Sequence, residues 1–216
     1  MRWFSCLFLA AAFLALTAPS AMAATVVKFD LTRLVSNADV IVVADVVDTE
    51  AAQGESGRVY TTITFRTQET LKGQPGKTFS IRQVGGTAGD LSTFVPGMPH
   101  FEPKQQVFLF VSDFDTRPVI TGLSQGRFEV VSDPDDETRL VVPRLQGVHL
   151  VEPGKPPTES DEPQAPDTAV PPTDDTDVPK VSLRIRDHNE LFGQTHKFEA
   201  FRDQVRQLVE AQESPR

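Results

Sequence analysis

Cysteine is almost absent from this chain, and its scarcity excludes two kinds of structure. Cys6 is the single cysteine among 216 residues, and one thiol cannot form an intramolecular disulfide. The four histidines, at positions 100, 149, 188 and 196, show no H-x-H or H-E-x-x-H spacing that would supply the three or four ligands of a zinc site. We therefore expect no metal site and no cofactor, and a fold that is held together by burial alone.

Basic residues are also scarce. The chain has 21 Lys and Arg against 30 Asp and Glu, a net charge of -9. Proteins that bind nucleic acid need a basic face, so we expect no nucleic-acid partner. A protein or a glycan is the kind of partner that this composition allows.

Long apolar runs are missing as well. The run Leu7 to Leu16 is shorter than the roughly 20 apolar residues of a membrane-spanning helix. It follows the positive start Met1-Arg2 and precedes the A-x-A site Ala21-Met22-Ala23, which together indicate a secretory signal peptide over residues 1–23. We expect a mature chain that begins at Ala24 in the periplasm or outside the cell, with no stable membrane insertion after cleavage. A retained N-terminal anchor is the alternative.

The mature sequence is rich in strand patterns. Asp30 is placed to cap a short helix that carries Leu31, Leu34 and Val35. Alternating or β-branched runs, with no helices between them, then predict a mainly β fold over residues 24–151: a small antiparallel OB-like barrel or sandwich. The predicted strands are Val40–Val47, Val59–Leu71, Phe79–Val84, Val107–Val111, Pro118–Thr121, Arg127–Val131 and Leu140–Val142, with a long loop over Gly85–Pro103.

The C-terminal third changes character. Residues 152–180 contain eight prolines, eight acidic and two basic residues, a composition typical of a disordered loop or linker. Residues 181–216 then predict a returning strand, Val181 to Ile185, and a C-terminal amphipathic helix. Its apolar stripe is Phe198, Phe201, Val205, Leu208 and Val209. Either the strand forms a hairpin with the region of Val148 and Leu150, or the acidic segment is a spacer between two units.

One motif suggests catalysis. Gly122-Leu123-Ser124-Gln125-Gly126 matches the G-x-S-x-G of serine hydrolases, in which the serine sits on a strand-to-helix turn. Here a predicted strand follows the motif, so we expect no catalytic residue, and a hydrolase that uses Ser124 is the alternative.

The long loop contains the candidate binding residues. Pro96 to Phe101 places apolar side chains in a stiff segment, and glycines at 85 and 86 precede it. Phe101 and Met98 could plug one end of the barrel, or the loop could form a recognition rim, since loops on rigid scaffolds often bind ligands. The candidate rim is Gly85, Gly86, Pro96, Gly97, Met98, Pro99, His100 and Phe101.

Several short motifs resemble known proteins. They are Ala38-Asp39 with the apolar run to Ala44, Glu69-Thr70-Leu71-Lys72-Gly73, Gly85-Gly86, Gly97 to Phe101 and Gln125 to Phe128. Their order resembles a group of uncharacterised secreted bacterial β-barrel proteins and, remotely, the OB-like N-terminal domain of tissue inhibitors of metalloproteinases. The resemblance implies a fold more than an activity. The inhibitors act through an N-terminal cysteine, and Ala24 stands where that cysteine would be.

These observations favour a non-catalytic binding or interaction domain outside the cytoplasm. An envelope-structural protein, with the acidic segment as a spacer, is a further alternative.

Overall fold

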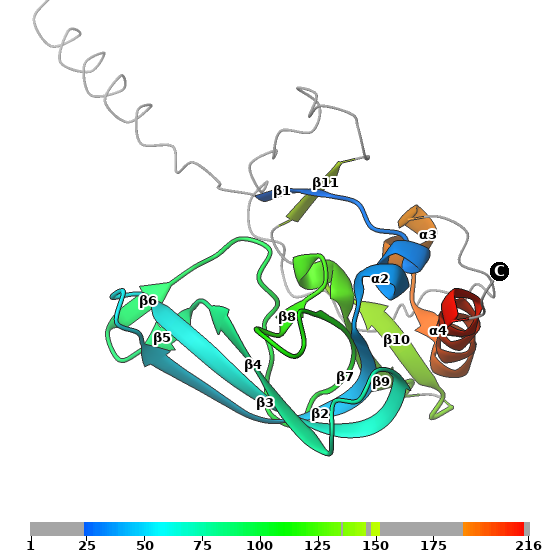
Figure 1. Ribbon diagram of the computed structural model, residues 1–216, viewed down its shortest axis with the longest axis horizontal. Helices are drawn as coiled ribbons and strands as arrows, with labels where there is room; N and C mark the ends of the chain where they lie inside the picture. The colour runs from blue at the N-terminus through cyan, green and yellow to red at the C-terminus, as the bar shows by residue number, and fades with distance from the viewer. Residues whose placement is uncertain (1–23, 135, 146–147, 152–187, 214–216) are drawn as a thin grey trace, which may run out of the picture.

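The computed structural model describes residues 24–134, 136–145, 148–151 and 188–213 (Figure 1). The predicted signal peptide, the acidic segment 152–180 and the predicted strand 181–185 lie outside these residues.

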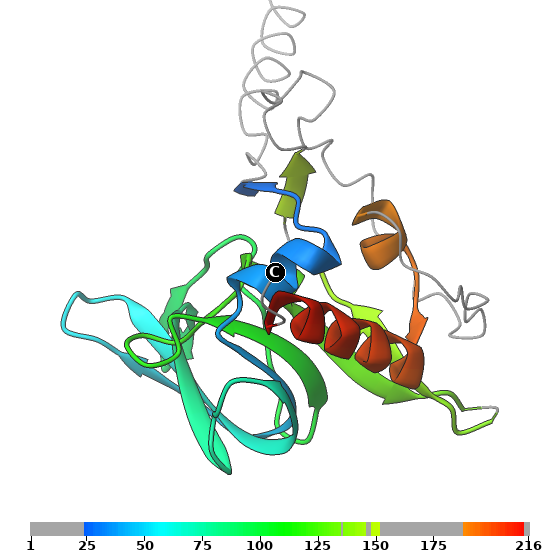
Figure 2. The same cartoon turned by 45° about the vertical axis from the view of Figure 1, so that its right-hand side comes forward.

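An antiparallel sheet forms the body of the protein. Its strand order is β12-β10-β9-β7-β2-β3-β4, and β8 pairs with β7 beside that path. The sheet curls, so that β2, β3 and β4 bend round toward the loop that carries β8 (Figures 1 and 2). The predicted mainly β, antiparallel fold with a C-terminal helix is confirmed. The strands are β2 Val40–Gln53, β3 Val59–Lys72, β4 Thr78–Val84, β7 Gln106–Ser112, β8 Val119–Ile120, β9 Arg127–Ser132, β10 Arg139–Pro143 and β12 His196–Lys197.

Both faces of the central strands are buried, as their β-branched and aromatic runs predict. On the inner, concave side, alternate residues of β2 and β7 pack with Ile63, Phe65 and Ile81. On the other side, the intervening residues meet three helices: α2 Leu31–Asn37, α3 His188–Gly193 and α4 Phe198–Glu213. Strand alternation thus divides one apolar run between two cores.

Helix α2 begins as predicted. The Asp30 side chain accepts a hydrogen bond from the backbone N–H of Arg33 (2.7 Å), which satisfies one of the free donors of the first turn. Leu31, Leu34 and Val35 are buried against the sheet. This helix fixes the direction in which the chain enters β2.

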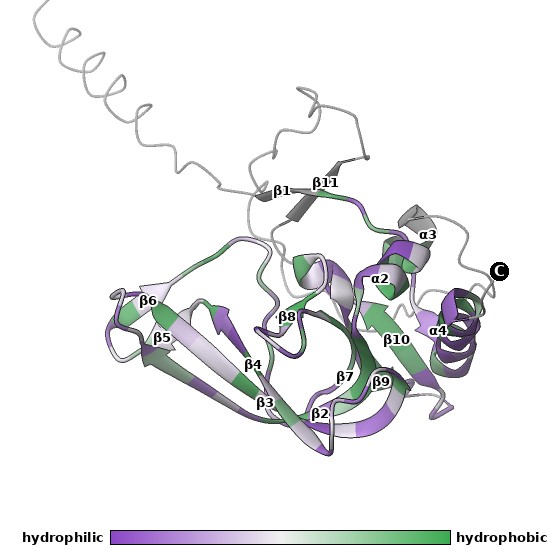
Figure 3. Ribbon diagram, viewed as in Figure 1, coloured by the Kyte–Doolittle hydropathy of each residue, from purple (hydrophilic) through white to green (hydrophobic). Residues whose placement is uncertain are grey.

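Helix α4 docks on the sheet along its predicted stripe. Phe198, Phe201, Val205 and Val209 are buried, and Leu208 is partly buried. In Figure 2 the helix runs beside α2 and β10, and its outward side in Figure 3 is hydrophilic. No helix in the described ranges is long and apolar enough to cross a membrane.

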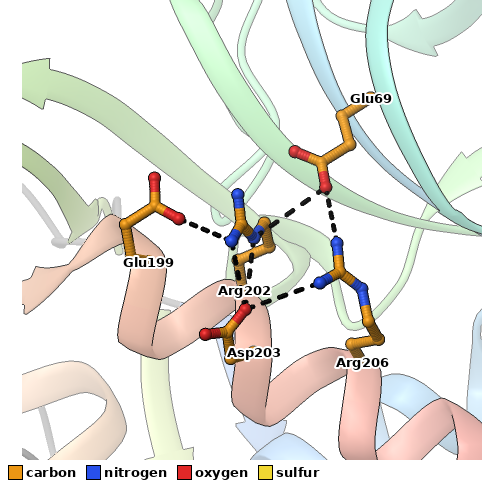
Figure 4. Close-up of polar contacts among 5 residues, drawn as sticks. All are labelled: Glu69, Glu199, Arg202, Asp203 and Arg206. Carbon is orange, nitrogen blue, oxygen red and sulfur yellow. Dashed lines mark hydrogen bonds and ion pairs between the residues drawn. The ribbon is translucent and has the colours of Figure 1, made fainter.

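Ion pairs join the polar side of α4 to β3 (Figure 4). Arg206 Nη2 lies 2.9 Å from Glu69 Oε1, and Arg202 Nε lies 3.9 Å from the same oxygen. Arg202 also contacts Glu199 (2.6 Å) and Asp203 (3.1 Å) on its own helix. Because these side chains are partly exposed, the network contributes little to stability.

Two elements differ from the sequence prediction. The segment predicted as a long loop contains a small hairpin, β5 Gly86–Ala88 and β6 Leu91–Thr93. The chain near Val148 is extended as expected, in β11 Val148–Val151, but its described partner is β1 Ala24–Val27, in parallel. Segments of three or four residues are too short to show a period, so neither the hairpin nor the partner of β11 could be predicted from the sequence.

Candidate functional site

A groove of about 930 Å³ opens between β4 and β8. The β2–β3 turn, the loop before β7 and the 3-10 turn Leu123–Gly126 complete its walls. Its volume is at the upper end of the range for ligand pockets. The lining residues are Gln53, Gly54, Glu55, Ser56, Tyr60, Ile81, Arg82, Gln83, Val84, Met98, Pro99, Arg117, Val119, Ile120 and Leu123.

The groove follows the edge of β4. Its lining includes four consecutive residues of this strand, Ile81 to Val84. Because side chains of successive strand residues point to opposite faces, four consecutive residues can line one groove only if it follows the edge of the strand. Strand β4 pairs with β3 on one side and with no described strand on the other, and β8 likewise pairs with β7 alone. Within the part of the chain that the structure describes, the groove therefore lies between two unpaired strand edges.

The ladder between β3 and β4 shows which backbone groups are turned to the groove. Gly85 N donates to Val59 O (2.9 Å), and Thr67 N donates to Lys77 O (3.0 Å). Antiparallel pairs alternate between bonded and non-bonded positions, so odd-numbered residues of β4 bond to β3. The N–H and C=O groups of Arg82 and Val84 consequently point away from β3, along the free edge.

Two arginines give the groove its charge. The guanidinium of Arg82 lies over the ring of Tyr60, 4.3 Å from the ring centroid. Arg117 is exposed at the opposite wall. Neither has an ion-pair partner within the described part of the chain, and Glu55 is the one acidic residue in the lining. The groove thus carries a net positive charge in a protein whose net charge is -9.

Two residues of the predicted rim, Met98 and Pro99, line this groove. Gln83 Nε2 donates to the carbonyl of Pro99 (2.7 Å), which ties the loop to β4. Ser124 N donates to the carbonyl of Gly97 (3.1 Å), which ties it to the 3-10 turn. These bonds hold the loop in place as a wall of the groove.

The other rim residues are placed elsewhere. Phe101 is 4% exposed, and its ring meets Phe65 edge to face, with 5.3 Å between centroids. Phe101 fills the inner core, whereas Met98, which the plug alternative grouped with it, lines the groove. His100 is exposed, with Nε2 3.8 Å from Glu102 Oε1. Pro96 is partly buried, and it does not line the groove.

Gly85 and Gly86 have a structural role at the crossing from β4 to β5. Gly86 has a φ of +115°, and a Cβ atom there would collide with Oγ1 of Thr61. That hydroxyl itself donates to the carbonyl of Gly85 (2.7 Å). Only glycine allows this close approach at a positive φ.

Ser124 lies in the 3-10 turn and not on a strand-to-helix turn. The turn ends at Gly126, and β9 follows directly. Ser124 is 0% exposed, and its Oγ has no hydrogen-bond partner within the described chain. A nucleophilic serine needs an exposed hydroxyl and a base within hydrogen-bond reach.

Apart from the groove, the structure contains polar clusters that the sequence did not indicate. Burial lowers the pKa of Arg127, whose Nη2 donates to Gln105 Oε1 (3.1 Å), while the carboxylate of Glu129 acts in the opposite direction. Asp45 accepts hydrogen bonds from Gln106, Arg66 and Gln68. Within the described residues, no group of three or more His, Cys, Asp or Glu side chains could hold a metal ion.

Comparison of the chain with family models, with curated proteins and with solved structures found no match. The site is therefore interpreted from its own geometry. The sequence located the loop wall of the groove but not Tyr60, Arg82 and Arg117. Tyr60 and Arg82 meet through the pairing of β3 with β4, and the curl of the sheet brings Arg117 opposite them. The one usable signal was Tyr60, the single tyrosine of the chain.

Proposed function

We propose that the protein is a non-catalytic binding domain that works outside the cytoplasm and takes its ligand in the groove between β4 and β8. The observation that carries the proposal is the groove itself, with a continuous unpaired strand edge beside two arginines that have no described ion-pair partner. The signal-peptide pattern of residues 1–23 supports the location.

The residues of the groove suit binding better than catalysis. Apolar side chains such as Ile81 and Met98 share the lining with polar and charged ones such as Arg82, so the groove can contact both an apolar and a charged part of a ligand. The hydroxyl of Ser124 is enclosed, so nothing in its geometry favours the hydrolase alternative.

Site-specific photo-crosslinking tests the proposal. Since Cys6 would be removed with the signal peptide, a single introduced cysteine gives one attachment point in the mature chain. We would attach a benzophenone maleimide to Ser56→Cys, on the groove, and to Ser92→Cys, on β6, as the matched control. Both serines are exposed, and each makes side-chain hydrogen bonds.

The labelled proteins would be irradiated with an extracytoplasmic extract and the adducts identified by mass spectrometry. The expected result is one saturable adduct on the Ser56→Cys protein that the Ser92→Cys protein lacks. Equal labelling of both positions, or none at Ser56→Cys at any extract concentration, would contradict a ligand in the groove.

A further inference from the structure

We propose that the ligand of the groove is an extended acidic peptide segment that adds as a strand to the free edge of β4. This inference rests on the proposed function, and it names the chemical class of the ligand.

The backbone of β4 carries the first part of the argument. The outward N–H and C=O groups of Arg82 and Val84 are spaced by two strand residues, about 6.8 Å. An extended peptide presents its own N–H and C=O groups at the same period, so it can pair with both residues at once. Strand β8 has two residues against seven in β4, so it opposes only part of this edge.

The edge also lacks the usual protection. Native sheets shield an exposed edge with proline, a bulge, charged side chains or a covering element. Strand β4 has no proline, its pairing with β3 runs without a register shift, Arg82 is its one charged residue, and a groove lies along its outer side. An edge left open beside a shaped groove is suited to strand addition.

The side chains set the expected pattern of the peptide. Arg82 is exposed on one face of β4, whereas Ile81, on the other face, belongs to the inner core and lines the groove together with Met98 and Leu123. Opposite charges favour each other across paired strands. The peptide should therefore alternate, with acidic side chains on the face of Arg82 and apolar side chains on the face of Ile81. Arg117, on the far wall, adds attraction for the same charge.

Defined peptides test this inference. We would titrate ¹⁵N-labelled mature protein with three acetylated, amidated seven-residue peptides that alternate valine with aspartate, lysine or serine. The amide signals of Arg82 and Val84 report binding at the edge, and their hydrogen exchange reports pairing. A fourth peptide repeats the aspartate sequence with N-methyl groups on the amides that would face β4.

The aspartate peptide should bind most tightly, with slower exchange of the Arg82 and Val84 amides. Arg82→Gln and Arg117→Gln should each weaken it about two- to fivefold, the range for exposed ion pairs. Lys197→Gln, on β12 at the opposite end of the strand order, is the control and should leave affinity unchanged. Each N-methyl group should weaken binding about two- to tenfold through a lost hydrogen bond.

Equal binding of the aspartate and lysine peptides, or full binding of the N-methylated peptide, would overturn the inference. If crosslinking at Ser56→Cys captures a ligand while no peptide binds, the groove is a binding site for another class of molecule. If both experiments fail, the proposed function is wrong as well.

Discussion

Truncation of Phe201 to alanine is the most demanding test of the way α4 is held on the sheet. Phe201 is 1% exposed. Its ring lies 5.0 Å from Phe108, edge to face, and 5.0 Å from Phe128, with the His196 ring 5.9 Å away. Phe-to-Ala changes in cores cost about 3–5 kcal/mol, and each aromatic pair contributes about 0.5–1.5 kcal/mol beyond burial. Two close ring pairs place the expected cost near the upper end, about 4–5 kcal/mol.

Urea unfolding followed by far-UV circular dichroism measures the effect, because the mature chain would contain no tryptophan. With a slope of about 2 kcal/mol per molar urea, the midpoint should fall by about 2 M. Gln207→Ala, at an exposed position of the same helix, is the control and should change stability by less than about 0.5 kcal/mol. An unchanged midpoint for Phe201→Ala would refute the docking argument, and loss of a partner at unchanged stability would make α4 an interaction arm.

Four further predictions follow from the residues already described. Gly86→Ala should destabilise the protein by about 1–3 kcal/mol in urea unfolding, since the backbone there has a φ of +115° and the new Cβ would collide with Thr61 Oγ1. Gly89→Ala is the control, because the space around it is open, and it should cost about 1 kcal/mol. Equal losses of stability in the two variants would contradict the collision. Burial raises the pKa of Asp45, but hydrogen bonds from Gln106, Arg66 and Gln68 outweigh it and lower that pKa below 3.8. The carboxylate therefore stabilises the fold above pH 3.8, and this stabilisation is lost as the pH falls through the folded pKa. The urea midpoint of Asp45→Asn should therefore fall less between pH 7 and pH 3 than the midpoint of the parent protein. Equal falls in the two midpoints would exclude the effect. Ser124→Ala should leave ligand binding intact and stability equal or slightly higher, because it removes an unpartnered buried hydroxyl; labelling of Ser124 by a fluorophosphonate would revive the hydrolase alternative. Intact mass of the exported protein should show Ala24 as its first residue, and retention of Trp3 and Cys6 would contradict cleavage.

Much of the fold followed from local pattern. The β-branched run from Val40 and the apolar run from Val107 became β2 and β7, and the stripe of Phe198, Phe201 and Val205 became the buried side of α4. In each case hydrophobic period and length are properties of a single segment, so the segment alone predicts its structure. The cap at Asp30 was predictable for the same reason, because donor and acceptor are three residues apart.

The candidate site was less predictable. Met98 and Pro99 could be singled out, since a loop rich in proline and glycine can be recognised from the sequence. The same reasoning grouped them with Phe101 and His100, although alternate burial sends these to the core and to solvent. Neighbouring residues of a loop lie close together, but their side chains can point in different directions. The sequence therefore could not distinguish the residues that form the groove wall from the residue that fills the core.

The sequence by itself determined which segments form strands, where the amphipathic helix lies and that the chain is acidic, because those properties depend on neighbouring residues. The tertiary structure alone decided that β4 and β8 each have one lateral edge without a partner strand among the described residues, and that Arg82, Arg117 and Tyr60 share one groove. These residues are up to 57 positions apart in the chain. Their meeting depends on strand order and on the curl of the sheet, which come from the packing of all segments together and not from the pattern of any one of them.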